Sequence, residues 1–336
     1  MQILMEKAMK TKMILFLAVL LAAASACNGG EQVADTTEPV DSVDSVQPEL
    51  DDNMQPSATP EPTEIPAPSG KIVFSSNRGE NPGKLGLHVL DVGTGEFSEI
   101  ETGLLVSFFP KWSPDGSTVM YVDPLPYFIY TIKEDGTEKV QVTNIRSNNG
   151  DWSPDGSQIV FQSDHDNEPQ DTPDLYVIDT DGSNLEEILD DPPQIDFSPR
   201  WSPNGDQVLF ISMRTGRMQM YTLDLSDLAF EQISDFEMNI SEAVWSPDGS
   251  RIAFSADDGS GSDIYAVDAD GVSNLVQLTE DGNANLYPCW SPDGSRIVYS
   301  SKASGNTDLW MVLFDGSETT QLTDDEWDDL FPDWVR

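Results

Sequence analysis

The chain has 336 residues and carries 17 Lys or Arg against 60 Asp or Glu, which gives a formal net charge of −43 at pH 7. This excess of acid argues against binding to nucleic acid or directly to anionic lipid, because both repel a negative surface. With only two Cys and two His, a disulfide framework and a zinc site of the usual Cys and His type are excluded.

The first 26 residues are typical of a signal peptide. Three lysines precede an apolar run over residues 13–24, which is too short to span a membrane as a mature helix. The following Ala24–Cys27 resembles a bacterial lipobox, although Leu is usual where Ala24 stands. This resemblance implies that Cys27 is lipidated and that the chain is anchored to a membrane of the cell envelope outside the cytoplasm. An ordinary cleavage that releases a soluble protein is the alternative.

Residues 27–69 are expected to be a lipidated N-terminus followed by an extended acidic linker. They are rich in Pro, Ser and Thr, and contain ten acidic residues and no Lys or Arg. Such a composition cannot bury enough apolar surface to fold, and charge repulsion and Pro extend it. The linker is interpreted as a spacer between the membrane and the domain at 70–336, with a docking tail for a basic partner as the alternative.

The motif Trp-Ser-Pro-Asp-Gly recurs four times in the domain, with a variant that has Asn204 in place of Asp and a sixth Trp near the end of the chain. Pro fixes φ at the second position of a tight turn, Asp suits the third, and Gly adopts the left-handed conformation at the fourth. A spacing of about 40–45 residues predicts a repeat architecture. The repeat tryptophans are Trp112, Trp152, Trp201, Trp245, Trp290 and Trp334.

Each repeat predicts four antiparallel strands, which is one blade of a β-propeller. The first strand ends at the Trp, the second follows the Ser-Pro-Asp-Gly turn, and the third and fourth flank an Asp-Gly turn. Residues 71–101 have no Trp strand before them, and the strand of Trp334 has no partner after it. If the strand of Trp334 pairs with residues 71–101, the two segments form the sixth blade and the ring has no open edge. The predicted fold class is all-β, with the C-terminal inner strand joining the N-terminal outer three.

The repeated Trp-Ser-Pro-Asp-Gly, the Ile-x-Phe second strand and the ending Gln277–Thr279 resemble the β-propeller of the TolB family, a family of WD40-like repeats. The resemblance covers residues 70–336. It implies a monomeric propeller that binds a protein or peptide of the cell envelope and needs no cofactor. TolB proteins also carry a small α/β domain before the propeller, where this chain has only the linker. That difference leaves a role in a Tol–Pal system open.

Loop lengths distinguish the two faces of the predicted ring. The short Ser-Pro-Asp-Gly and Asp-Gly turns lie on one face, here the turn face, and long variable loops lie on the other, here the loop face. Function tends to lie on variable loops, and Arg and Trp are enriched at binding hot spots. Arg217 and Trp327 are therefore expected to anchor a partner. The candidate binding residues are Arg200, Arg214, Arg217, Asp164, Asp166, Trp327, Asp328 and Asp329.

No constellation of catalytic residues is found, and His88 and Cys289 are interpreted as buried sheet residues. The acidic loop 164–174 lacks the Gly and Glu of an EF-hand, but its carboxylates leave calcium possible. The favoured function is a non-catalytic protein- or peptide-binding scaffold. The alternative is a calcium-assisted carbohydrate-active enzyme or a glycan-binding propeller, since fold alone does not decide. Two criteria distinguish these functions at the mouth of the ring's central channel. Carboxylates that converge there favour the alternative, whereas a mixed apolar and charged surface favours the scaffold.

Overall fold

The computed structural model describes residues 65–79, 83–164, 172–189 and 194–336. The chain divides into two units, Met1–Pro66 and Ala67–Arg336, and every described strand belongs to the second. The signal peptide, Cys27 and nearly all of the linker lie outside the described residues. Within the described ranges, no helix is long and apolar enough to cross a bilayer.

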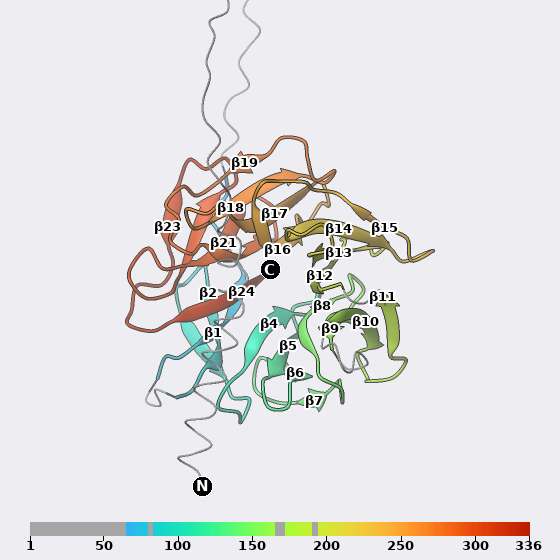
Figure 1. Ribbon diagram of the computed structural model, residues 1–336. Helices are drawn as coiled ribbons and strands as arrows, with labels where there is room; N and C mark the ends of the chain where they lie inside the picture. Colours follow the sequence, from blue (N-terminus) through green and yellow to red (C-terminus); the bar gives the residue numbers. More distant parts are fainter. Residues whose placement is uncertain (1–64, 80–82, 165–171, 190–193) are drawn as a thin grey trace, which may run out of the picture. The chain divides into compact units, whose positions relative to one another are not determined.

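The described strands form six antiparallel sheets of four strands, arranged as a ring of blades (Figure 1). The prediction of an all-β propeller with six blades is confirmed. The inner strands of blades 1 to 6 are β24 (Asp329–Val335), β4 (Phe108–Trp112), β8 (Asn148–Trp152), β12 (Asp196–Trp201), β16 (Asn239–Trp245) and β20 (Leu286–Trp290).

The three outer strands of each blade follow in chain order. The second strands are β1 (Lys71–Ser76), β5 (Thr118–Asp123), β9 (Gln158–Ser163), β13 (Gln207–Ser212), β17 (Arg251–Asp257) and β21 (Arg296–Ser301). The third strands are β2 (Gly86–Asp91), β6 (Phe128–Lys133), β10 (Asp174–Asp179), β14 (Gln219–Asp224), β18 (Ser262–Asp268) and β22 (Asp308–Leu313). The fourth strands are β3 (Phe97–Ile100), β7 (Val140–Gln141), β11 (Glu186–Leu189), β15 (Phe230–Gln232), β19 (Val276–Gln277) and β23 (Thr319–Gln321).

Blade 1 closes the ring, because β24 at the end of the chain pairs with β1 at the start of the domain. Their register places Ile72 opposite Trp334 and Ser76 opposite Asp329. Nε1 of Trp334 also donates a hydrogen bond to the carbonyl oxygen of Ser69 at 3.0 Å. The closure predicted from the two incomplete repeats is therefore the closure that the structure has.

The hydrophobic core lies between neighbouring blades. Most residues of the second and third strands are buried, and four of the five described apolar clusters combine two adjacent sheets, as where Val73 of blade 1 packs with Trp112 of blade 2. The fifth combines residues of blades 1, 2 and 3. Some repeat tryptophans also bond to the previous inner strand: Nε1 of Trp152 donates to the carbonyl oxygen of Lys111 at 3.2 Å. The repeat Trp thus fills the space between two blades, which explains its spacing.

The Ser-Pro-Asp-Gly turns are held by their own side chains. Oδ1 of Asp155 accepts hydrogen bonds from Oγ of Ser153 at 2.7 Å and from N of Ser157 at 3.0 Å. These bonds lower the pKa of Asp155 to about 2. Gly156 follows with a φ of 72°, the left-handed conformation that Gly adopts without steric cost. In blade 4, Asn204 accepts the same bond from its turn serine.

Candidate functional site

Each inner strand places one residue against the ring axis, three positions before its repeat Trp. Every inner strand pairs with its second strand through a register shift near this point. In five of the six strands this residue has a positive φ, between 43° and 58°, which is uncommon outside Gly. This register shift, a β-bulge, therefore determines which side chain of each inner strand faces the axis. The six channel residues are Phe109, Asn149, Ser198, Glu242, Tyr287 and Phe331.

One half of the channel, from blades 6, 1 and 2, is aromatic. The ring centroid of Phe331 lies 4.3 Å from that of Phe109 and 4.5 Å from that of Tyr287. Phe109 and Phe331 are buried, and burial raises the pKa of Tyr287, so its phenol stays neutral. Aromatic pairs at this spacing pack favourably beyond their buried area.

The other half, from blades 3, 4 and 5, is a buried polar network around Arg200. Nη2 of Arg200 donates to Oε2 of Glu242 at 3.0 Å and to Oδ1 of Asn149 at 2.9 Å. Oε1 of Glu242 accepts from Nδ2 of Asn149 at 2.8 Å and from Oγ of Ser198 at 3.0 Å. A buried ion pair with several hydrogen bonds is costly to break, because the remaining charge stays desolvated.

Nearer the turn face, Lys111, Cys289 and Asp333, each directly before a repeat Trp, form a second layer. Nζ of Lys111 lies 3.0 Å from Oδ1 of Asp333. Burial opposes the charge of Lys111, but Asp333 and other acidic neighbours raise its pKa overall. Burial, reinforced by Asp333, raises the pKa of Cys289 to about 12. Cys289 is therefore a buried thiol and no nucleophile at neutral pH, as expected.

The two layers leave little space at the axis. The cavity between the channel residues, Arg200 and the neighbouring prolines has a volume of about 20 Å³, which holds roughly one water molecule. Glu242 is the one acid among the residues that line it. The lining of this cavity therefore combines aromatic groups with the paired charges of Arg200 and Glu242.

The prediction that Arg200 lies on a loop is wrong. Arg200 directly precedes Trp201 on β12, where the inner strand faces the channel, and it is 6% exposed. Its guanidinium is held by Glu242 and Asn149 inside the ring. Arg200 thus serves the packing of the axis.

Arg214 also forms internal contacts. Its Nη2 donates to both carboxylate oxygens of Asp196, at 3.0 and 2.9 Å, and its guanidinium lies 4.1 Å from the ring centroid of Phe230. Arg78 repeats this arrangement in blade 1, with Asp329 at 2.6 Å and Phe97 at 4.3 Å. The two arginines are equivalent in the repeat, which indicates a structural role.

The other predicted residues lie at separate places on the loop face. Arg217 is half-exposed in blade 4 and lies 2.6 Å from Glu237, whereas Trp327 is partly exposed in the loop between blades 6 and 1. Asp164 pairs with Arg146 at 2.9 Å. Asp328 accepts a hydrogen bond from N of Thr307 at 3.0 Å. Asp329 lies buried at the start of β24, and Asp166 lies outside the described residues.

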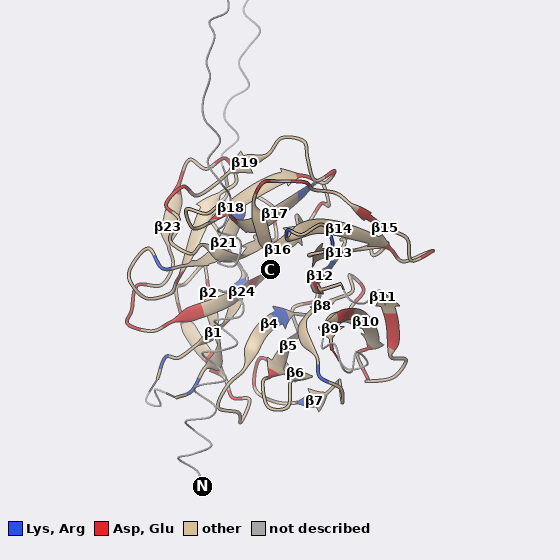
Figure 2. Cartoon of the chain, viewed as in Figure 1, with Lys and Arg blue, Asp and Glu red and all other residues tan. Residues whose placement is uncertain are grey.

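Asp and Glu are spread over all six blades, and Lys and Arg are few among them (Figure 2). Residues 70–336 hold 14 Lys or Arg and 49 Asp or Glu. His88 is buried on β2, and burial lowers its pKa to about 4, so it is a neutral sheet residue, as expected.

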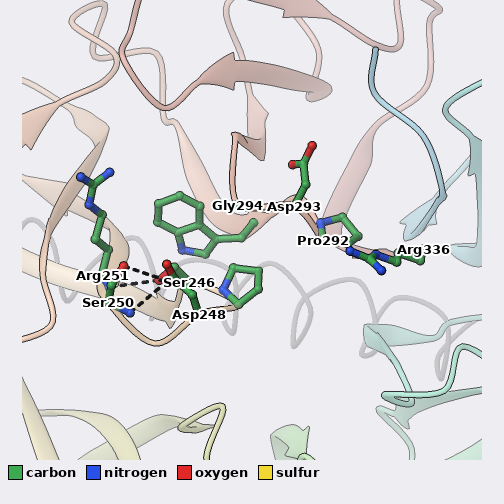
Figure 3. Close-up of a pocket in the computed structure, with 10 residues that line it drawn as sticks. Ser246, Asp248, Ser250, Arg251, Pro292, Asp293, Gly294 and Arg336 are labelled. Carbon is green, nitrogen blue, oxygen red and sulfur yellow. Dashed lines mark hydrogen bonds between the residues drawn. The ribbon is translucent and has the colours of Figure 1, made fainter. Parts of the chain in front are cut away.

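A hollow of about 590 Å³ lies on the turn face, between the Ser-Pro-Asp-Gly turns of blades 5 and 6 (Figure 3). Its acids are already engaged: Asp248 accepts from Ser246 at 2.7 Å, and Asp293 accepts from Ser291 at 2.6 Å. Arg251 lies over the ring of Phe314 at 3.9 Å. Because these contacts belong to the repeated turns, the hollow follows from the spacing between two blades.

The channel residues were not among the functional residues predicted from the sequence. The signal was present, since they all stand three positions before a repeat Trp. The six comprise five different residue types that differ in size and polarity, however, so they do not form a motif. Only the bulge, which sequence spacing does not reveal, brings them together.

Residues 171–335 match a family model described as the TolB beta propeller domain. The Tol-Pal system protein TolB of Anaeromyxobacter dehalogenans (strain 2CP-C) is 32% identical over 159 residues, which are 47% of this chain and 31% of that protein. The domain is a six-bladed β-propeller similar to that of TolB. The chain thus spans about a third of the length of the curated TolB relatives that it matches first.

Two further comparisons agree with a TolB-like propeller. An uncharacterised protein of Agrobacterium fabrum (strain C58) is 28% identical over 203 residues, 56% of this chain and 67% of that protein. The crystal structure of TolB from Acinetobacter baumannii superimposes with a TM-score of 0.69 at 20% identity, covering 80% of this chain and 67% of that one. At this identity the structural likeness supports the fold alone.

Proposed function

We propose that the protein is an extracytoplasmic lipoprotein whose TolB-like propeller binds a protein or peptide of the cell envelope and catalyses no reaction. The observation that carries the proposal is the lining of the narrow cavity at the axis. Its one acid among the described residues, Glu242, is paired with Arg200, and its other half is aromatic, so this cavity offers no pair of free carboxylates to act on a glycan.

The loop face supports contact with a macromolecule. Partly exposed apolar residues from three consecutive blades, Leu85, Val106, Tyr127, Tyr287 and Leu330, pack against the cluster that holds Phe109 and Phe331. On the same face, Leu105 and Leu125 are 56% and 65% exposed. Apolar groups surrounded by an acidic surface suit a partner with an apolar anchor and basic flanks.

A photo-cross-linking experiment tests the binding face. The full chain carries a photoreactive residue either at Leu125, on the loop face of blade 2, or at Thr137, exposed on the turn face of the same blade. We expect a protein adduct in envelope preparations from position 125 and none from position 137. An adduct from position 137 alone would place the partner on the turn face, and the absence of any adduct would oppose a binding function.

Anchoring rests on Cys27 and is tested separately. Two or more acyl chains hold a protein stably at a bilayer, whereas a protein without them is released. We expect Cys27→Ser to move the protein from the membrane fraction to the soluble fraction, or to leave an unprocessed precursor. Wild-type protein that is soluble and has a free Cys27 thiol would contradict the lipoprotein proposal.

A further inference from the structure

Three carboxylates meet on the loop face where blade 6 adjoins blade 1. Asp308 begins β22, Asp325 lies in the loop before β24, and Asp329 begins β24. One oxygen from each lies within 4.8 Å of the others. Asp308 and Asp329 are fully buried, whereas Asp325 is exposed.

At the junction of blades 5 and 6, an amide occupies one of the three equivalent positions and donates hydrogen bonds to the other two. There the equivalent residues are Asp263, Asp281 and Asn285. Nδ2 of Asn285 donates to Oδ1 of Asp263 at 3.0 Å and to Oδ1 of Asp281 at 2.6 Å. A single amide group therefore bridges both carboxylates.

At the closing junction, a carboxylate replaces this amide. Asp329 stands five residues before Trp334, as Asn285 stands before Trp290, and its backbone N bonds the equivalent carbonyl oxygen, that of Thr307. A carboxylate has no proton to donate. Its Oδ2 accepts from Arg78 at 2.6 Å, but its buried Oδ1 receives no hydrogen bond in the described part of the chain.

The single positive charge of Arg78 does not neutralise the three carboxylates at this junction. Arg78 lies 3.3 Å from Asp325 and 2.6 Å from Asp329, so one guanidinium is shared by two carboxylates. The third carboxylate, Asp308, accepts hydrogen bonds from the uncharged groups of Gln321 and Thr323 at 3.1 and 3.3 Å. The junction of blades 3 and 4 has an equivalent pair of buried carboxylates, Asp174 and Asp196, and there Arg214 binds both oxygens of Asp196.

We infer that Asp308, Asp325 and Asp329 bind one calcium ion, which takes the place of the bridging amide. Calcium accepts oxygen ligands at about 2.3–2.6 Å, so ligands on opposite sides of one ion lie about as far apart as these oxygens do. The cluster has no Cys or His, which favours a hard cation over a transition metal. The ion would join β22 to β24 and stabilise the junction that closes the ring. This inference does not depend on the proposed function.

Calcium titration of the full chain, first depleted with a chelator, tests the site. We expect isothermal titration calorimetry with calcium chloride to show one ion per chain. We also expect the melting temperature to rise by about 5–10 °C when free calcium reaches roughly 100 times Kd. In Asp329→Asn, which recreates the amide of Asn285, both responses should disappear while the chelated variant melts no lower than the chelated wild type.

Asp324→Asn is the matched control, because Asp324 is an exposed neighbour outside the cluster, and it should respond as the wild type does. If Asp329→Asn does not fold, Asp325→Asn at the exposed ligand should bind calcium at least tenfold more weakly. Absence of calcium binding to the wild type, an equal response of Asp329→Asn, or the same shift with sodium chloride of matched ionic strength would overturn the inference. A wild type that ignores calcium but is stabilised by mild acid would indicate a shared proton instead.

Discussion

Oδ2 of Asp333 accepts a hydrogen bond from the backbone N of Trp112 at 2.8 Å, across 221 residues of sequence. Asp333 directly precedes the last repeat Trp, and Trp112 ends the inner strand of the next blade. The same relationship joins Asp151 to N of Trp201 at 2.9 Å, and Sγ of Cys289 to N of Trp334 at 3.3 Å. At these three junctions, the residue before one repeat Trp holds the backbone of the next.

Ring closure by β24 predicts that the domain fails as a unit when this strand is damaged. Trp334 is buried between blades 6 and 1, so Trp334→Ala should lower the free energy of unfolding by about 3–5 kcal/mol. Deletion of residues 331–336 removes five of the seven residues of β24 and should abolish the cooperative urea transition. A truncated protein that keeps the wild-type melting temperature would contradict this closure.

The network around Arg200 predicts a non-additive response to mutation. Arg200→Met leaves Glu242 charged and buried without its partner, which should cost about 3–5 kcal/mol of stability. Arg200→Met combined with Glu242→Leu removes both charges, so it should cost less than the sum of the two single variants. Urea unfolding of the three variants measures the coupling, and additive losses would show that the two side chains do not act as a pair.

The fold could be predicted from the sequence because its causes are local and repeated. The Ser-Pro-Asp-Gly turn sets chain reversal by backbone chemistry, and the alternating apolar residues set the buried strands. The two incomplete repeats then gave the number of blades. The pairing of the strand of Trp334 with the first strand of the domain could be predicted from the register of the repeat alone.

The roles of the arginines could not be predicted in this way. Arg200 lies near variable loops in the sequence, but a bulge in β12 and the pleat of the strand turn it into the channel. Arg214 meets Asp196 only because β12 and β13 pair. Sequence spacing does not show which acid lies opposite a basic residue, so an arginine used for packing resembles one that is free to bind.

The repeated turns predict a specific loss of stability in acid. Hydrogen bonds from their serines lower the pKa of Asp155 and Asp248 to about 2, from an ordinary value of 3.8. A depressed folded-state pKa contributes stability that is complete above the unfolded value and is lost as pH falls through the folded value. Wild-type stability should therefore decrease from pH 4 toward pH 2.

The matched variant combines Asp155→Asn and Asp248→Asn. Asn accepts the same serine bond without titrating, as Asn204 does from Ser202 at 2.7 Å. The double variant should thus lose less stability than the wild type between pH 4 and pH 2, as measured by urea midpoints at both values. Equal losses in the two proteins would mean that these turn carboxylates do not contribute to acid sensitivity.

The last prediction concerns Arg217 and Trp327 as anchors on the loop face. They lie in blade 4 and at the junction of blades 6 and 1, on opposite sides of a six-bladed ring, so one partner must be protein-sized to contact both. Arg217→Ala and Trp327→Ala should each weaken capture of the cross-linked partner by about 1 kcal/mol or more. Because exposed charges are screened by salt, capture should also weaken as ionic strength rises.

Two controls separate binding from folding in this experiment. Arg214→Ala breaks the bonds to buried Asp196, so it should lower the melting temperature, whereas Arg217→Ala should leave it unchanged, because the Glu237 that it pairs with is 86% exposed. Asp315→Ala changes an exposed Asp-Gly turn on the opposite face and should leave capture intact. If capture survived alanine at both Arg217 and Trp327 but failed with Asp315→Ala, the partner would bind the turn face, and the hypothesis of a loop-face site would be wrong.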